Sequence, residues 1–123
     1  MHELSVAVQL VEIASEKAAA LGNVQVEAVY VRLGPFSGVV KDALSFCFDG
    51  AARGTAIEGA RLEIEDVPAL VFCPRCTAER ELPDIQHLRC PVCGEPTPEV
   101  RAGSELELTA LEVTEASDHA AHR

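Results

Sequence analysis

The sequence has few aromatic residues: no tryptophan, one tyrosine and four phenylalanines among 123 residues. Hydrophobic residues nevertheless make up 48% of the chain, which excludes an intrinsically disordered protein. The core must therefore consist mainly of aliphatic side chains. The length allows one domain, or one domain with a small appended module.

Positive charge is also scarce, because ten Lys and Arg residues stand against 20 Asp and Glu residues, a formal net charge of -10. Phosphate backbones and anionic membrane surfaces repel such a chain. We therefore expect neither nucleic acid nor a membrane as a partner. Proteins, small molecules and metal cations remain as candidate partners.

The sequence lacks a basic leader and a long apolar run. Met1-His2-Glu3 opens an amphipathic pattern, which is not typical of a secretory signal. No apolar run approaches the roughly 20 residues of a membrane span. We therefore expect a cytoplasmic protein, and in a reducing cytosol paired Cys-x-x-Cys motifs are more often metal ligands than disulfides.

Hydrophobic periodicity predicts an α+β fold. Apolar residues recur at helical spacing over residues 4–21 and again over about 38–53, where Ser37 is a suitable N-cap. Alternating or Val-rich segments predict strands at 24–33, 60–67 and 105–113. We predict two helices packed on a small, mainly antiparallel three-stranded sheet, with a zinc-ribbon module inserted before the last strand.

Composition divides the chain further. Residues 70–102 hold four of the five cysteines and mark a separate zinc-binding module, while residues 1–69 and 103–113 form the α/β domain. Residues 114–123 have no periodicity, which predicts a flexible tail. His119 and His122 in that tail have helical spacing, but a solvated tail is the simpler interpretation.

The four cysteines form two matched pairs, Cys73-Pro-Arg-Cys76 and Cys90-Pro-Val-Cys93, thirteen residues apart. Two cysteines at this spacing can present both sulfurs to one tetrahedral ion, so the pattern predicts a structural zinc site closed by four protein ligands. Disulfides would need an oxidising compartment, and a redox motif fits two matched pairs poorly. Iron can occupy the same four thiolates, so zinc and iron both stay open.

The first three residues form a second candidate site. A terminal amine, the amide and imidazole nitrogens of His2 and the amide of Glu3 offer four nitrogens in a plane, a donor set suited to Ni²⁺ or Cu²⁺. However, His2 can equally be an exposed residue without a metal-binding role. An acidic residue such as Glu3 is common at a helix N-terminus, where the helix dipole favours it. The residues alone therefore do not decide whether this segment binds a metal ion.

Taken together, these features resemble a known family, the HypA/HybF hydrogenase maturation factors. The resemblance runs from the first residue to about Val113. It rests on the paired Cys-x-x-Cys motifs and on three segments: Met1-His2-Glu3-Leu4-Ser5, Leu33-Gly34-Pro35-Phe36-Ser37 and Phe46-Cys47-Phe48-Asp49.

The resemblance implies a nickel metallochaperone and not an enzyme. It implies that Ni(II) is a transient cargo held by Met1, His2 and Glu3, and that structural zinc is held by the four cysteines Cys73, Cys76, Cys90 and Cys93. The implied partners are the GTPase HypB and the large subunit of [NiFe] hydrogenase.

This chain departs from the family pattern at two places. A carboxylate that some members add from the second helix falls on Val40 here, with Asp42 nearby. Of the histidines that some members carry beside the zinc ligands, only His87 is a candidate. The sequence does not decide whether urease is also served or whether the chain forms a homodimer. The alternative function is a zinc-ribbon protein-interaction module without a nickel role.

Overall fold

The computed structural model describes residues 3–115 of the chain. Their contacts form two compact units. The helical unit contains residues up to 31, residues 39–64 and residues from 108 onward, and the cysteine unit contains residues 32–38 and 65–107. The sequence places the zinc-binding module at 70–102, and the contacts add the flanking residues 65–69 and 103–107 and the distant segment 32–38 to it.

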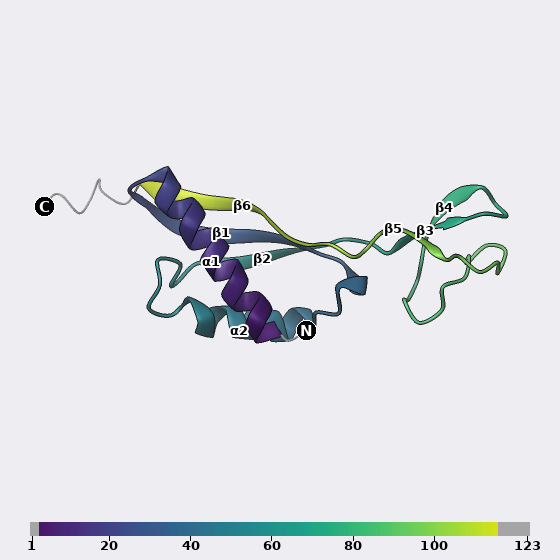
Figure 1. Ribbon diagram of the computed structural model, residues 1–123, viewed down its shortest axis with the longest axis horizontal. Helices are drawn as coiled ribbons and strands as arrows, with labels where there is room; N and C mark the ends of the chain where they lie inside the picture. Colours follow the sequence, from purple (N-terminus) through teal and green to yellow (C-terminus); the bar gives the residue numbers. More distant parts are fainter. Residues whose placement is uncertain (1–2, 116–123) are drawn as a thin grey trace, which may run out of the picture. The chain divides into compact units, whose positions relative to one another are not determined.

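Two helices form one layer of the helical unit (Figure 1). Helix α1 (Glu3–Leu21) ends before Gly22, whose φ of 100° a side chain would disfavour. Helix α2 (Lys41–Ala52) packs against α1. Neither helix of the described chain has the length and apolar character needed to cross a bilayer. The buried stripe of α1 follows the predicted helical spacing and contains Val6, Ala7, Leu10, Val11, Ala14 and Ala18.

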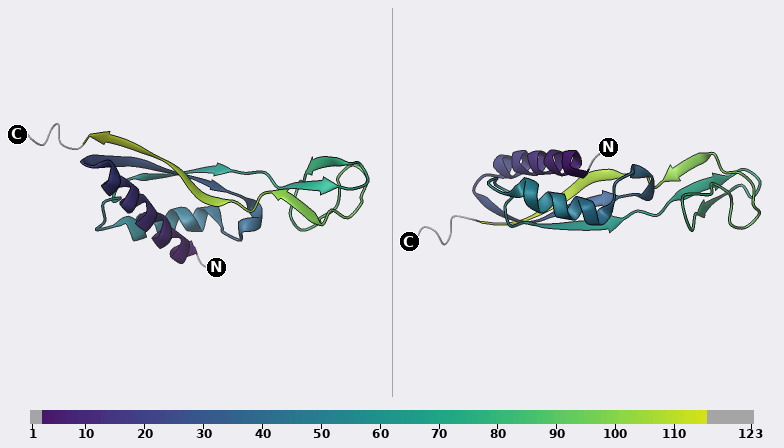
Figure 2. Two further views of the ribbon diagram at one scale, coloured as in Figure 1. Left: turned by 45° about the horizontal axis from the view of Figure 1, so that its top comes forward. Right: turned by 90° about the horizontal axis from the view of Figure 1, so that it is seen from below.

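The larger sheet has three strands in the order β2-β1-β6. Strand β1 (Val24–Leu33) is central, between β2 (Arg61–Asp66) and β6 (Leu106–Glu115). Strands β1 and β2 run in the same direction and β6 runs against them (Figure 2), because α2 lies in the crossover that joins β1 to β2. The predicted α+β class, with two helices on a small three-stranded sheet, is confirmed, and the β1–β2 pair is its one parallel pairing among the described strands.

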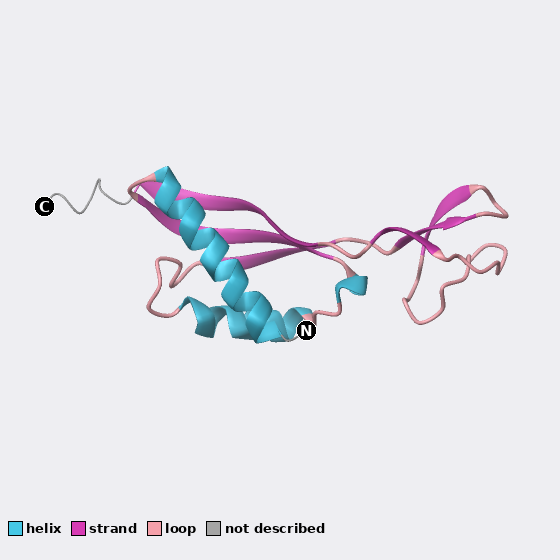
Figure 3. Ribbon diagram, in the orientation of Figure 1, coloured by secondary structure: helices cyan, strands magenta, loops and turns pink. Residues whose placement is uncertain are grey.

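The cysteine unit contains a second small sheet with the order β4-β3-β5, coloured magenta in Figure 3. Its strands are β3 (Leu70–Cys73), β4 (Ala78–Glu81) and β5 (Glu99–Ala102), and both pairings are antiparallel. A buried hydrophobic cluster of this unit is small, so its burial contributes little to holding the three strands together. That cluster consists of Ala69, Val71 and Leu82, with Phe36 packed against it.

The predicted N-cap of the second helix is wrong. Ser37 ends a short 3-10 turn, η1 (Pro35–Ser37), and Gly38 then reverses the chain with a φ of 80°. The α-helix begins only at Lys41, with Val40 as its N-cap. Val40 has no side-chain oxygen, and its N–H instead donates to the Glu3 carboxylate at 2.9 Å. Sequence spacing missed this because the capping oxygen comes from the other helix.

Strand β6 extends beyond its predicted end. Thr114 and Glu115, which the sequence assigns to the tail, continue the strand. The Thr114 hydroxyl donates to the Glu27 carboxylate at 3.1 Å. The rest of the predicted tail, including His119 and His122, lies outside the described residues.

Helix α2 offers a direct comparison of two phenylalanines. Phe48 is fully buried, whereas Phe46 is 81% exposed. We expect Phe48→Leu to lower the free energy of unfolding by about 1–2 kcal/mol, because the smaller side chain leaves a gap in a packed core. Phe46→Leu should change it by less than about 0.5 kcal/mol. Urea unfolding followed by circular dichroism measures both, and equal losses would contradict the burial of Phe48.

Candidate metal centre

The first cysteine pair occupies the turn between β3 and β4. Cys73 is the last residue of β3, and its carbonyl accepts a hydrogen bond from the Thr77 N–H at 2.8 Å. The Cys76 N–H points at the Cys73 Sγ, 3.3 Å away. Thr77 has a φ of 54°, a left-handed conformation that is uncommon for a β-branched residue. The turn thus directs backbone N–H groups toward the place where a thiolate charge would lie.

The second pair repeats this geometry in a loop between β4 and β5. The Cys90 carbonyl accepts from the Gly94 N–H at 2.8 Å, and the Val92 N–H points at the Cys90 Sγ at 3.4 Å. Gly94 has a φ of 80°, and so occupies the same left-handed region as Thr77. Two segments with different sequences therefore form the same thiolate-holding turn.

The two turns bring four sulfurs together, all within 4.8 Å of one another. The Cys73 and Cys93 sulfurs are 3.5 Å apart, and those of Cys76 and Cys90 are 3.9 Å apart. These separations are too long for disulfides. A tetrahedral ion with metal–sulfur bonds of about 2.3 Å has sulfur–sulfur edges of about 3.8 Å. The four thiols fit a thiolate-preferring cation such as Zn²⁺.

The electrostatics of the cluster also favour a cation. Burial opposes ionisation of Cys90, yet the backbone N–H groups of Cys93 and Val92 lower the pKa of its thiol to about 6. At Cys93 the Glu95 N–H favours the thiolate, but burial and the neighbouring sulfurs raise the pKa to about 12. Four adjacent sulfurs therefore cannot all ionise unaided, and a bound divalent cation would supply the missing positive charge.

His87 is not part of this cluster. Its side chain is 77% exposed, and its Nδ1 lies 3.5 Å from an oxygen of Asp84. Among the described residues, only the four cysteines bring at least three His, Cys, Asp or Glu ligand atoms close enough for one ion. The candidate histidine beside the zinc ligands is therefore a surface residue.

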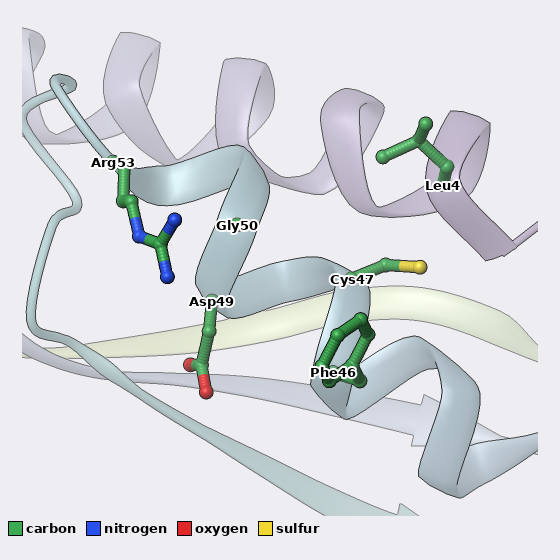
Figure 4. Close-up of a pocket in the computed structure, with 6 residues that line it drawn as sticks. All are labelled: Leu4, Phe46, Cys47, Asp49, Gly50 and Arg53. Atoms are coloured by element: carbon green, nitrogen blue, oxygen red, sulfur yellow. The ribbon is translucent and has the colours of Figure 1, made fainter.

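Cys47 lies apart, in a surface pocket on α1 and α2 (Figure 4). The residue is half-buried. The pocket has a volume of about 450 Å³ and is lined by Leu4, Phe46, Cys47, Asp49, Gly50 and Arg53. Cys47 is therefore a natural control for substitutions of the four clustered cysteines.

Of the three predicted nickel ligands, Met1 and His2 lie outside the described residues. Glu3 is the first residue of α1, and its carboxylate accepts the hydrogen bond from the Val40 N–H described above. The start of α1 is thereby tied to the start of α2. Asp42 is exposed in the first turn of α2, where the helix dipole favours a carboxylate.

Comparison with known proteins identifies the family. The model of the family described as "Hydrogenase/urease nickel incorporation, metallochaperone, hypA" matches residues 1–113. The chain belongs to the HypA family. The hydrogenase maturation factor HypA of Roseiflexus sp. (strain RS-1) is 54% identical over 112 residues, with 91% of each chain covered. That of Deinococcus radiodurans is 44% identical over 108 residues, covering 88% of this chain and 89% of the relative.

A solved structure agrees with this fold. The solution structure of the Ni metallochaperone HypA from Helicobacter pylori superimposes with a TM-score of 0.61 at 24% identity, covering 91% of this chain and 97% of that one. Membership of the HypA family confirms the resemblance seen in the sequence. The protein is therefore a metallochaperone of a family described by hydrogenase/urease nickel incorporation, and not an enzyme.

Sequence reasoning missed one residue at this centre. The neighbouring thiols of Cys76 and Cys90 raise the pKa of the Arg80 guanidinium. The only signal in the sequence is that Arg80 follows the first cysteine pair by four residues. That spacing does not reveal its proximity to Cys90.

Proposed function

We propose that this protein binds Ni(II) through its first three residues and delivers it to the large subunit of [NiFe] hydrogenase. The observation that carries the proposal is the match of residues 1–113 to the HypA family. That match includes the Met1-His2-Glu3 segment on which the nickel chemistry depends. The cargo is a transient one, because a carrier must release the metal that it binds.

The proposed ligands are the terminal amine of Met1, the amide and imidazole nitrogens of His2, and the amide nitrogen of Glu3. Two amidates cancel the charge of the cation, which would otherwise be disfavoured at the positive end of α1. The Glu3 carboxylate has a different task, since it bonds the Val40 N–H. Release follows when amidates regain protons or when a partner offers better ligands.

We further propose that zinc occupies the four-cysteine cluster as a structural ion. Cys73, Cys76, Cys90 and Cys93 would supply all four ligands, leaving no open position for chemistry. The sulfur spacing and the N–H groups directed at two of the sulfurs support this assignment. Zinc would compensate for the small core of the cysteine unit.

The partners that we propose are the GTPase HypB and the hydrogenase large subunit, encountered in the cytoplasm. A net charge of -10 supports protein partners over nucleic acid. The alternative is a protein-interaction module that holds zinc but carries no nickel. Nickel binding at the N-terminus separates these two functions.

The test is a nickel titration of zinc-loaded, untagged protein, with intact mass establishing that Met1 is retained. We expect one Ni²⁺ per chain and a visible absorption band of planar nickel. His2→Ala, and a form extended by one residue before Met1, should each weaken binding about 100-fold or more, because each removes or displaces a chelating nitrogen.

His87→Ala is the matched control, because it removes an exposed imidazole that is not a proposed ligand. It should bind nickel as the unaltered chain does. Unchanged binding by His2→Ala would contradict the N-terminal site. Absence of binding by the unaltered, zinc-loaded chain would favour the interaction module.

A further inference from the structure

Phe46 differs from the other four aromatic residues of the chain. Each of those four has a contact within the fold: Phe48 is fully buried, Phe36 packs on a hydrophobic cluster, Phe72 lies against an arginine guanidinium, and Tyr30 donates a hydrogen bond to a glutamate. Phe46 is instead 81% exposed. Aromatic side chains are enriched at interfaces, because each buries a large area. Phe46 is therefore a candidate anchor for another molecule.

Gly50 is a second residue of α2 whose identity the fold does not explain. It lies within the helix, where glycine is less favourable than alanine. Its φ is not positive, and an added Cβ would meet no atom of the described chain within 4 Å. Neither backbone conformation nor internal packing therefore requires glycine here. A bare backbone at an exposed position does, however, let a second helix approach closely.

Phe46 and Gly50 share one face of α2 with Asp49 and Arg53, and we call these four residues the α2 stripe. Their positions follow the i, i+3, i+4, i+7 spacing of a helix face, and all four are exposed. Arg53 directly follows the last residue of the helix. Residues at this spacing form the surface that one helix presents to another.

The α2 stripe borders a recess as well as carrying an anchor. All four of its residues line the surface pocket described above, together with Cys47 and with Leu4 from α1 (Figure 4). The volume of about 450 Å³ is enough for an aromatic ring. One surface of the helical unit therefore carries both an exposed aromatic side chain and a pocket of a size to receive one.

The charges of the α2 stripe are opposite in sign and one helical turn apart. Among the described residues, the side chains of Asp49 and Arg53 form no hydrogen bond or ion pair with each other or with a neighbour. In two antiparallel helices related by a twofold axis, Asp49 of each can face Arg53 of the other, so that both charges are paired at once. The stripe also carries no net charge, whereas the chain carries -10. Two copies repel one another overall, but not locally at this stripe.

We propose that the α2 stripe is a contact between two copies of this chain, in which Phe46 of each copy occupies the pocket of the other. A twofold contact requires one surface to carry both halves of every interaction. The α2 stripe does so, because it combines an anchor with a pocket and a carboxylate with a guanidinium. Gly50 lies where the two helix backbones would cross. A different protein would need only the complementary half, and the contact depends on neither the nickel segment nor the zinc centre.

The first test is sedimentation velocity of untagged, zinc-loaded, full-length protein over a series of concentrations. We expect a reversible monomer–dimer equilibrium, because a contact of this small size is weak. Phe46→Ser should weaken association about tenfold or more, since it removes the anchor. Ile13→Ser is the matched control, because it removes an exposed apolar side chain of α1 that does not line the pocket. An equal loss in both variants, or a chain that is monomeric at every concentration, would overturn the proposal.

Gly50→Ala separates association from stability. Alanine should stabilise the helical unit, because it favours a helix more than glycine does. The same methyl group should weaken association, because it would lie between the crossing helices. Urea unfolding and sedimentation measure the two effects. Association that stays as strong as in the unaltered chain would overturn the crossing at Gly50.

Charge exchange provides the decisive readout. Asp49→Arg and Arg53→Asp each place like charges opposite one another in the twofold contact, so each variant alone should be monomeric. An equimolar mixture of the two should form a mixed dimer, because every facing pair is then of opposite charge. The double variant should likewise associate with itself, and misfolding cannot produce either rescue.

Absence of both rescues would overturn the twofold contact. The stripe would belong to a different protein if the unaltered chain stayed monomeric while Phe46→Ser lost binding to one of the two partners proposed above. That outcome would also overturn the contact between two copies.

Discussion

Cys73→Ala is expected to abolish zinc binding and to unfold the cysteine unit while the helical unit stays folded. Binding of a structural zinc ion by four thiolates contributes about 10–16 kcal/mol to folding in small metal domains. The cysteine unit has little to replace it, because its hydrophobic cluster consists of Ala69, Val71 and Leu82 with Phe36. Its sheet is built from three strands of four residues each.

Hydrogen exchange followed by mass spectrometry measures this outcome segment by segment. Amides of β3, β4 and β5 should exchange close to the rate of an unfolded chain, whereas those of α1 should remain protected. Cys47→Ala is the matched control, because it removes the fifth cysteine from α2 and leaves the four clustered sulfurs intact. It should keep one zinc ion and normal protection of β3.

Two outcomes would contradict this expectation. Retention of one zinc ion by Cys73→Ala would mean that three sulfurs and an outside ligand suffice. Normal exchange in a metal-free chain would mean that the cysteine unit folds on packing alone. Either result would remove the structural role assigned to zinc, whereas the nickel segment would be unaffected.

The sequence predicted local features well and contacts between distant segments poorly. Val24 and Leu33 bound both the predicted and the observed β1, because a Val-rich run followed by Gly34 leaves little choice. The four clustered cysteines were also predicted, since their spacing within each pair is a local property. The three short strands around them were not predicted, because four-residue strands have too few positions to display an alternating pattern.

The errors have a common physical origin. Ser37 satisfies every local requirement of an N-cap, yet Glu3 supplies the cap from 37 residues away. Arg80 resembles a surface residue in the charged segment of β4, yet its Nε is buried and the thiols of Cys76 and Cys90 raise the pKa of its guanidinium. In both cases the deciding partner is distant in sequence, and no periodicity within one segment can reveal it.

Gly34 is the clearest case of a residue whose role only the fold reveals. The Gly34-Pro35 pair reads as a simple chain break, but Gly34 has a φ of -102° and a ψ of 156°, an extended conformation open to any residue. A side chain at Gly34 is excluded instead by the Gly103 peptide, which lies too close. A Cβ on Gly34 would lie inside van der Waals contact of the Gly103 carbonyl, and no flexible side chain is there to move aside.

Gly34→Ala is therefore expected to destabilise the cysteine unit by on the order of 4 kcal/mol. The two segments must separate, which weakens two backbone hydrogen bonds, Gly34 N–H to the Glu105 carbonyl at 2.8 Å and Phe36 N–H to the Gly103 carbonyl at 2.7 Å. Phe36 would then leave the cluster of Ala69, Val71 and Leu82. Exchange of the Phe36 amide, measured by NMR in zinc-loaded protein, reports this opening directly.

Gly50→Ala is the control, and its expected effect has the opposite sign. Gly50 lies within α2, its added Cβ would meet no atom within 4 Å, and its φ is not positive. Alanine there should stabilise the helical unit by about 0.5–1 kcal/mol, because it restricts the unfolded chain more than glycine does. If Gly34→Ala left Phe36 exchange as slow as in Gly50→Ala, the close approach of Gly34 and Gly103 would not hold in solution, and Gly34 would be no more than a turn residue.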